Sequence, residues 1–151
     1  MILARSDPYG TKIYLEIRNL ACHYLKKDNG KLCLLPIVED IIALDPKMRF
    51  AAIIDLRGNI SEAIMKEGKT SLKTQKEEEH FCKQVAIRRK IRQQFDNSLG
   101  PVNYVHIERR KVTQFVLYPK RKTVYVTMEP NMDIERKLEI MELVKKKIAK
   151  L

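Results

Sequence analysis

The sequence predicts an α+β domain: a five-stranded antiparallel sheet with one long central helix and flanking helices. Two observations predict it. Residues 71–98 contain neither Gly nor Pro and are too many for a hairpin loop, so they are expected to be helical. Short apolar runs rich in β-branched residues recur between tight turns, at Phe50–Leu56, Ile60–Met65, Val102–Ile107, Val112–Tyr118 and Val124–Met128. The expected order is therefore α-α-β-β-α-β-β-β-α.

The first 33 residues are predicted to be a helical extension, and residues 34–151 to be the α+β domain. Thr11 can cap a helix whose apolar residues recur about every 3.6 positions, and Asp28-Asn29-Gly30 ends it. A second helix is expected from about Leu34 to Leu44. Pro36 fixes its start, since proline is tolerated only in a first turn, and Asp45-Pro46 stops it.

Two strands are expected next. Phe50–Ile54 is apolar on both faces, which is typical of a strand in the middle of a sheet. Gly58 supplies a positive φ in the reversal that follows. Ile60–Met65 carries Glu62 and precedes Lys66, which favours a more exposed position near the sheet edge.

The long helix of residues 71–98 is expected to be capped by Ser71 or Thr74. Its glutamates lie near its N-terminal end and its arginines in the C-terminal half, which suits the helix macrodipole. Its apolar residues cover more than one narrow stripe, so surface is left over for a second contact such as a dimer partner. They are Phe81, Cys82, Val85, Ala86, Ile87, Ile91 and Phe95.

Three further strands are expected to form a meander with charged turns, followed by a helix that Asp133 caps. His106 and Glu108 share one face of the predicted strand, but an acid/base couple between them is not expected. Their separation of about 7 Å along a regular strand predicts no direct hydrogen bond.

This order resembles the roadblock/dynein-light-chain family and its profilin-like relatives. Arg49–Ile60 looks like that family's opening, in which an apolar strand runs into Asp, a Gly turn and a second strand. Val124–Asp133 is similar to the close of small uncharacterised archaeal proteins of this type. Ile60–Met65 is bulkier than the Gly/Ala-rich second strand of better-known members. The resemblance implies a non-enzymatic adaptor that forms dimers and scaffolds motors or sits beside small Ras-like GTPases.

No signature of catalysis accompanies these elements. The sequence lacks GxxxxGK[ST], GxGxxG, HExxH and GxSxG, so we expect no enzymatic activity, no catalytic residue and no cofactor. Cys22, Cys33 and Cys82 form no CxxC pair and match no zinc pattern, so we expect no metal. Reduced thiols in a cytoplasmic protein are expected, with a Cys22–Cys33 disulfide as the alternative.

The formal net charge of +11 indicates attraction to polyanions or to an acidic partner. Three basic groups are candidate binding residues. They are Arg88, Arg89, Lys90 and Arg92 on the long helix, Arg109, Arg110 and Lys111 in one turn, and Lys120, Arg121 and Lys122 in another. Alternate turns of a meander lie at opposite ends of the sheet, so the two turn groups are not expected to join into one patch.

The leading hypothesis is a homodimeric adaptor for a small GTPase, another protein partner or a signalling complex, with no insertion into membranes. In the resembled family the long helix and the third strand meet their counterparts across a two-fold axis. The expected interface residues are Phe81, Val85, Ile87, Ile91, Val102 and Tyr104. Two alternatives stay open: a nucleic-acid-binding module that uses the basic helix and turns, and a small-ligand sensor domain.

Overall fold

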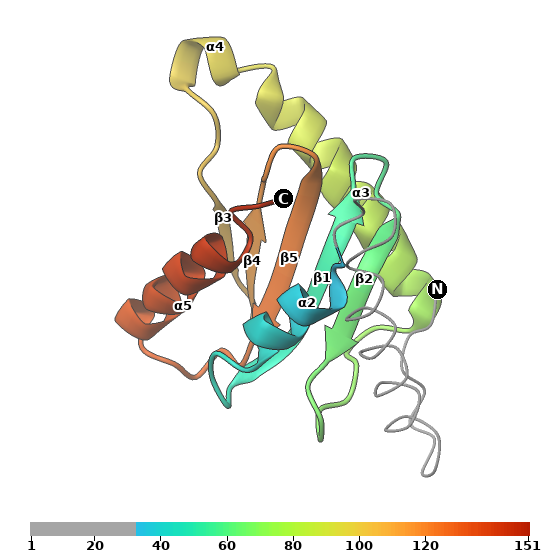
Figure 1. Ribbon diagram of the computed structural model, residues 1–151, viewed down its shortest axis with the longest axis vertical. Coiled ribbons are helices and arrows are strands. Elements are labelled where there is room, and N and C mark those ends of the chain that lie inside the picture. Colours follow the sequence, from blue (N-terminus) through green and yellow to red (C-terminus); the bar gives the residue numbers. More distant parts are fainter. Residues whose placement is uncertain (1–32) are drawn as a thin grey trace.

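A computed structural model describes residues 33–151 and contains five strands and four helices among them (Figure 1). In chain order they are α2 (Leu35–Ile42), β1 (Met48–Asp55), β2 (Ile60–Met65), α3 (Gln75–Gln93), α4 (Asp96–Leu99), β3 (Val105–Glu108), β4 (Thr113–Leu117), β5 (Lys122–Met128) and α5 (Ile134–Lys147). The predicted five-stranded α+β architecture is confirmed within the described residues. The predicted helix that starts at Thr11 lies outside them, and the division at residue 33 stays a prediction.

The sheet is antiparallel throughout and its strand order is β2-β1-β5-β4-β3. The strand β1 lies between β2 and β5 and is buried along most of its length, as its two apolar faces predict. Both β2 and β3 are edge strands. Helices α2 and α5 cover one face of the sheet and α3 crosses the other (Figure 1).

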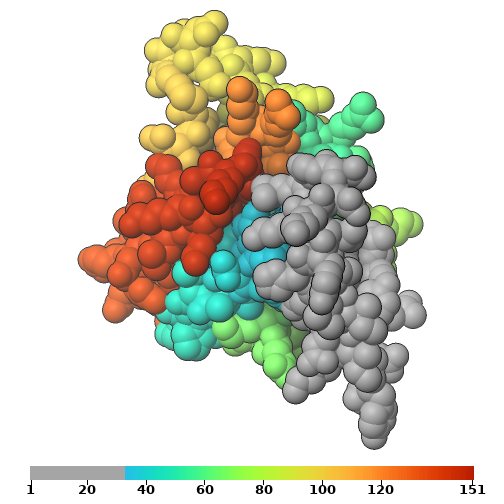
Figure 2. All heavy atoms as spheres, viewed as in Figure 1, coloured from blue at the N-terminus to red at the C-terminus, as the bar shows by residue number. Residues whose placement is uncertain are grey.

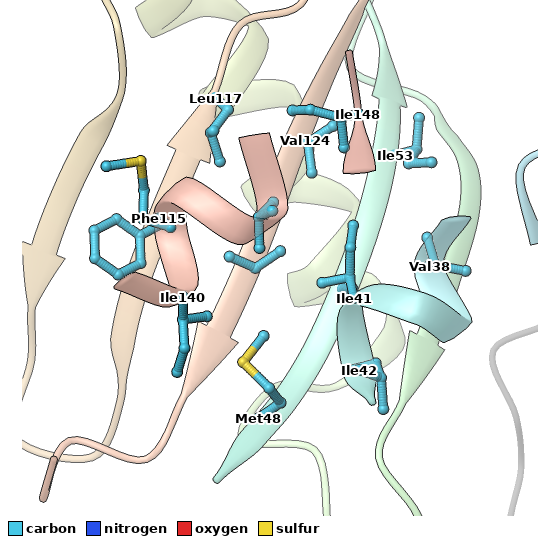
Figure 3. Packing of buried hydrophobic residues seen from close by; sticks show 14 of the residues in the cluster. Val38, Ile41, Ile42, Met48, Ile53, Phe115, Leu117, Val124, Ile140 and Ile148 are labelled. Atoms are coloured by element: carbon cyan, nitrogen blue, oxygen red, sulfur yellow. The ribbon is translucent and has the colours of Figure 1, made fainter. Parts of the chain in front are cut away.

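The larger core lies between the sheet and the pair α2 and α5. Figure 3 shows side chains from both helices and from the central strands converging there, among them Ile41, Met48, Phe115 and Ile140, each 0 % exposed. The short α2 is amphipathic and Pro36 lies in its first turn, where its missing N–H costs nothing. Figure 2 shows this α2 and α5 face, with α4 projecting beyond the body of the molecule.

The second core lies under α3. Cys82 and Val85 pack against Phe50, Ala52 and Tyr125 of the central strands. Thr74 caps α3 through a capping box with Glu77, which settles the choice between Ser71 and Thr74. Hydrogen bonds from the backbone N–H and the side chain of Thr74 lower the pKa of the exposed Glu77.

Two local expectations are corrected. The predicted single helix of residues 71–98 ends at Gln93, and a separate turn of helix, α4, follows. Gln94 and Phe95 form a turn between the two helices. Asp133 occupies the N-cap position of α5, but its side chain makes no capping hydrogen bond.

The cysteines differ from one another. Cys33 is disulfide-bonded, against the expectation of reduced thiols, whereas Cys82 is a free, buried thiol. Cys22 lies outside the described residues. Burial, together with the neighbouring Glu78, raises the pKa of Cys82 to about 12, so this thiol stays protonated and is a poor nucleophile near neutral pH.

Candidate functional site

The C-terminal half of α3 and the residues after it expose large apolar side chains to solvent. Ile87, Ile91, Phe95 and Leu99 are 49 %, 53 %, 57 % and 82 % exposed, and we call these four residues the apolar ridge. Figure 1 shows that this part of the chain extends beyond the sheet, with the segment after α4 running back to β3. The ridge therefore contributes little to the core of the subunit.

Helical periodicity explains why the ridge is exposed. Glu78, Cys82, Val85 and Arg89 recur at intervals of three and four residues and are buried. Ile87 and Ile91 are four residues apart and lie on a different side of the helix. One face of α3 is therefore used by the core, and its second apolar stripe is left without a partner among the described residues.

The six predicted interface residues separate into two groups. Ile87, Ile91 and Tyr104 are exposed and Val102 is half-buried. Val85 was wrongly expected on this surface, because it is 4 % exposed and packs in the core under α3. Phe81 is half-buried and its ring lies 5.0 Å from that of Tyr125, which joins it to the same core.

The expected binding role of Arg89 is also wrong. Its guanidinium is buried and donates hydrogen bonds to the backbone oxygens of Lys122 and Pro119 and to the Thr123 hydroxyl. It lies over the Tyr118 ring, 5.0 Å from the ring centroid. Desolvation lowers the pKa of Arg89, yet arginine remains charged near neutral pH. Arg89 thus fastens the β4–β5 turn to α3.

The other basic candidate residues lie at the surface and differ in how far they are exposed. The Arg92 guanidinium donates to the Tyr118 hydroxyl and the Lys122 ammonium donates to Ser61 Oγ, so both are half-buried. The remaining basic candidates are exposed: Arg88, Lys90, Arg109, Arg110, Lys111, Lys120 and Arg121. The two turn groups lie at opposite ends of β4, as the meander predicts.

His106 and Glu108 form a direct contact, which corrects the expectation from strand spacing. His106 Nε2 lies 2.7 Å from Glu108 Oε1, because the two long side chains bend toward each other across the space between their Cα atoms. The Lys137 ammonium donates to the same oxygen at 2.9 Å, and the Thr113 hydroxyl donates to Glu108 Oε2. The cluster joins β3, β4 and α5.

These contacts predict acid sensitivity. Burial alone raises the pKa of Glu108, but hydrogen bonds from Lys137, Thr113 and His106 outweigh it and lower the pKa to about 2. A carboxylate with a lowered folded-state pKa stabilises the protein above its unfolded pKa, and this contribution is lost as the pH falls through the folded value. Glu108→Gln is therefore expected to lower the urea midpoint at pH 7, with the difference from the parent protein shrinking between about pH 5 and pH 2.

The matched control for this measurement is Glu142→Gln, which removes the same charge from an exposed position of α5. A difference for Glu108→Gln that stays constant from about pH 7 to about pH 2 would contradict the assigned contacts.

Sequence reasoning missed two buried polar residues, one in the first turn of α3 and the other in β4. Glu78 and Gln114 are each 3 % exposed. Both occupy positions that the local periodicity assigns to the interior, since Glu78 lies four residues before Cys82, and Gln114 alternates with Val112 and Val116. Both residues could have been found in the sequence as polar residues at positions that the periodicity assigns to the interior.

Within the described part of the chain, no three His, Cys, Asp or Glu residues lie together as a group that could hold a metal ion. Over the same residues, no helix is long and apolar enough to cross a membrane.

The fold matches solved structures over most of their length. A Roadblock/LC7 domain from Streptomyces avermitilis aligns with a TM-score of 0.57 at 12 % identity, covering 75 % of this chain and 92 % of that one. The gliding protein MglB from Thermus thermophilus aligns with a TM-score of 0.64 at 10 % identity, covering 77 % and 85 %. Schizosaccharomyces pombe profilin aligns with a TM-score of 0.55 at 11 % identity, covering 78 % and 97 %.

At these identities the similarity defines the class of fold, a roadblock/profilin-like α+β domain. A family model described as "Family of unknown function (DUF6659)" matches residues 37–150, and the chain belongs to that family. A search of curated proteins found no match.

Proposed function

We propose that this protein is a non-enzymatic adaptor that forms a homodimer through the apolar ridge of α3 and α4 together with the edge strand β3. The observation that carries the proposal is the apolar ridge, four large side chains between 49 % and 82 % exposed in one subunit. Complete transfer of a side chain of this size from water into an apolar interface is worth about 1.5–3 kcal/mol. The ridge side chains still expose about half or more of their surface, so they can gain about the corresponding share of this free energy. Four such residues from each of two subunits supply an apolar centre for an interface.

The edge strand β3 supports the same surface. Its outer edge pairs with no strand among the described residues, and Tyr104, 37 % exposed, lies just before it. An edge strand with free backbone groups readily pairs with another chain. The roadblock resemblance implies that the long helix and the third strand of one subunit meet their counterparts in the other subunit across a two-fold axis. We propose the same arrangement here.

The proposed partner of the dimer is another protein, either a small Ras-like GTPase or a signalling complex. The roadblock resemblance implies that class of partner. The exposed basic residues and the net charge of +11 of the whole sequence favour a partner with an acidic surface.

The basic residues also predict how dimerisation responds to salt. Arg88 and Lys90 are exposed and lie between Ile87 and Ile91 in the sequence of α3. A two-fold axis near these residues brings like charges together, and salt screens that repulsion. The dimer is therefore expected to be stronger in about 0.5 M salt than in about 0.05 M salt. Nucleic-acid binding has the opposite dependence, because it weakens steeply as salt rises.

Ile91→Lys is expected to weaken dimerisation about a hundredfold or more, since it places a charge in the apolar centre of both subunits. Sedimentation equilibrium of the full chain at micromolar concentration measures the effect. The matched control is Ile134→Lys, which changes a similarly exposed isoleucine, 48 %, on the opposite face of the sheet. A monomeric parent protein, or equal effects of the two substitutions, would contradict the proposal.

The nucleic-acid alternative is weakened by two observations. Arg89 is unavailable in the core, and the basic turns at Arg109–Lys111 and Lys120–Lys122 lie at opposite ends of β4. Submicromolar binding of mixed DNA or RNA that falls steeply with salt would favour this alternative over the adaptor.

A further inference from the structure

A cavity of about 420 Å³ opens between the sheet and the first turns of α3, on the α3 face. Its floor is formed by β1, β4 and β5, and its walls by the loop before α3 and the β3–β4 turn. Sites for small organic ligands have volumes of about 300–1,000 Å³. The size of this cavity thus suits a small molecule rather than a single ion.

Polar side chains form a connected network along this cavity. The Arg109 Nε donates to Gln114 Oε1 at 3.2 Å, and Gln114 Nε2 donates to the Tyr125 hydroxyl at 3.0 Å. The Lys73 ammonium donates to the same hydroxyl at 3.3 Å and pairs with Glu78 Oε2 at 3.1 Å. Burial raises the pKa of Tyr125, so its hydroxyl stays protonated at neutral pH.

This network is costly for a packed core. Gln114, Tyr125 and the paired carboxylate of Glu78 are all nearly fully buried. When a buried ion pair is replaced by well-packed apolar residues of similar volume, the stability of the protein often stays the same or increases. A buried polar floor beside a cavity is an arrangement typical of a ligand site, where a few placed polar groups orient the bound molecule.

The rim of the cavity is strongly cationic. Its lining contains five basic side chains and one carboxylate, Glu78. Two of the five already have carboxylate partners, since Arg49 pairs with Glu129 and Lys73 with Glu78. The three residues of the β3–β4 turn, 109–111, form no ion pair with the described residues. The rim therefore offers unneutralised positive charge to a bound anion.

The lower walls are apolar and aromatic. Phe81 lies beside Tyr125, with ring centroids 5.0 Å apart, and Phe50, Met65 and Leu72 line the same cavity. The Lys73 ammonium lies over the Phe81 and Tyr125 rings, 4.4 Å and 5.3 Å from their centroids. A bound molecule thus meets cations at the rim and, below it, aromatic and apolar side chains with the Lys73 ammonium beside them.

We propose that this cavity binds a small organic anion with a planar apolar body and a carboxylate or phosphate head. The Arg110 and Lys111 side chains attract the head at the rim, and the body lies against Phe81 with Gln114 and Tyr125 beneath it. This site is separate from the apolar ridge and does not depend on the adaptor proposal.

The test is ¹H–¹⁵N NMR titration of the full chain with 2-naphthoate, 2-naphthyl phosphate, the neutral 2-naphthol and inorganic phosphate. The first two probes are expected to shift amides around residues 72–81, 109–114 and 125–127, and the stronger of them identifies the preferred head group. The neutral and inorganic probes are expected to bind at least about tenfold more weakly. No shifts at these residues, or equal affinity for 2-naphthol, would overturn the proposal.

A pair of double variants tests the role of the rim. Arg110→Glu/Lys111→Glu is expected to weaken binding of the better probe about tenfold or more. Lys120→Glu/Arg121→Glu makes the same change of charge in the turn at the opposite end of β4 and is expected to change affinity less than about twofold. All four side chains are exposed, so both variants are expected to fold, which the dispersion of their spectra checks. Equal weakening by both would mean generic attraction of anions and would overturn the site.

Discussion

Gly58→Ala is expected to destabilise the domain by about 2–5 kcal/mol, a large part of the roughly 5–15 kcal/mol typical of a folded domain. Gly58 has φ +84°, and a residue with a Cβ in this left-handed region costs roughly 1–2 kcal/mol. The added Cβ would also lie 2.7 Å from Lys83 Cα and 2.9 Å from the Cys82 carbonyl oxygen. Both atoms belong to the α3 backbone, which cannot yield without moving the helix, and such overpacking adds about 1–3 kcal/mol.

Gly68→Ala is the matched control for this effect. Gly68 has nearly the same backbone conformation, φ +79°, but a Cβ there would meet nothing within 4 Å. It is expected to show only the conformational cost of roughly 1–2 kcal/mol. Urea unfolding followed by far-UV circular dichroism measures both. Equal losses for the two variants would show that the contact of the β1–β2 turn with α3 contributes nothing.

Arg89→Ala is the second substitution with a large expected effect, about 2–4 kcal/mol. The guanidinium donates at 2.8 Å to the Pro119 oxygen and at 3.0 Å to the Thr123 hydroxyl, and it also donates to the Lys122 oxygen. Alanine leaves these part-buried acceptors without their charged donor. The β4–β5 turn is therefore expected to lose its attachment to α3, and hydrogen exchange of the amides around residues 118–123 is expected to accelerate.

Arg88→Ala provides the control for the loss of one positive charge from the same helix. Arg88 is the preceding residue and is exposed, so its replacement is expected to change the free energy of unfolding by less than about 0.5 kcal/mol. Arg89→Lys keeps the charge, but its single ammonium cannot match the planar fork of the guanidinium, so an intermediate loss is expected. An Arg89→Ala protein as stable as Arg88→Ala would rule out the anchoring role.

Local patterns in the sequence were sufficient for the architecture of the described region. The apolar run at Phe50–Ile54 predicted a central strand and the charged Ile60–Met65 an edge strand, and the sheet has both in those places. Gly58 was identified from the sequence, and Thr74 was one of two candidate caps, because a positive φ and a helix cap are local requirements on backbone geometry.

The direction of individual side chains was less predictable. Val85 and Ile87 lie about 200° apart around α3, but both are apolar, so the sequence alone does not show which of the two sides faces the sheet. The same uncertainty placed Arg89 among the surface cations. The length of side chains also limited the prediction. The spacing of His106 and Glu108 along the strand predicted no contact, but their long side chains bend toward each other and meet.

The sequence alone determined the order of the five strands and of α2, α3 and α5 among them, because that order follows from periodicity, caps and turns that each involve a few neighbouring residues. Only the tertiary structure decided which side of α3 faces the sheet, and with it the exposed apolar ridge and the buried Arg89. Only the tertiary structure brought Lys73, Arg109, Gln114 and Tyr125 around one cavity. These residues come from three separate parts of the chain, and their meeting depends on how the sheet and α3 pack rather than on any local pattern.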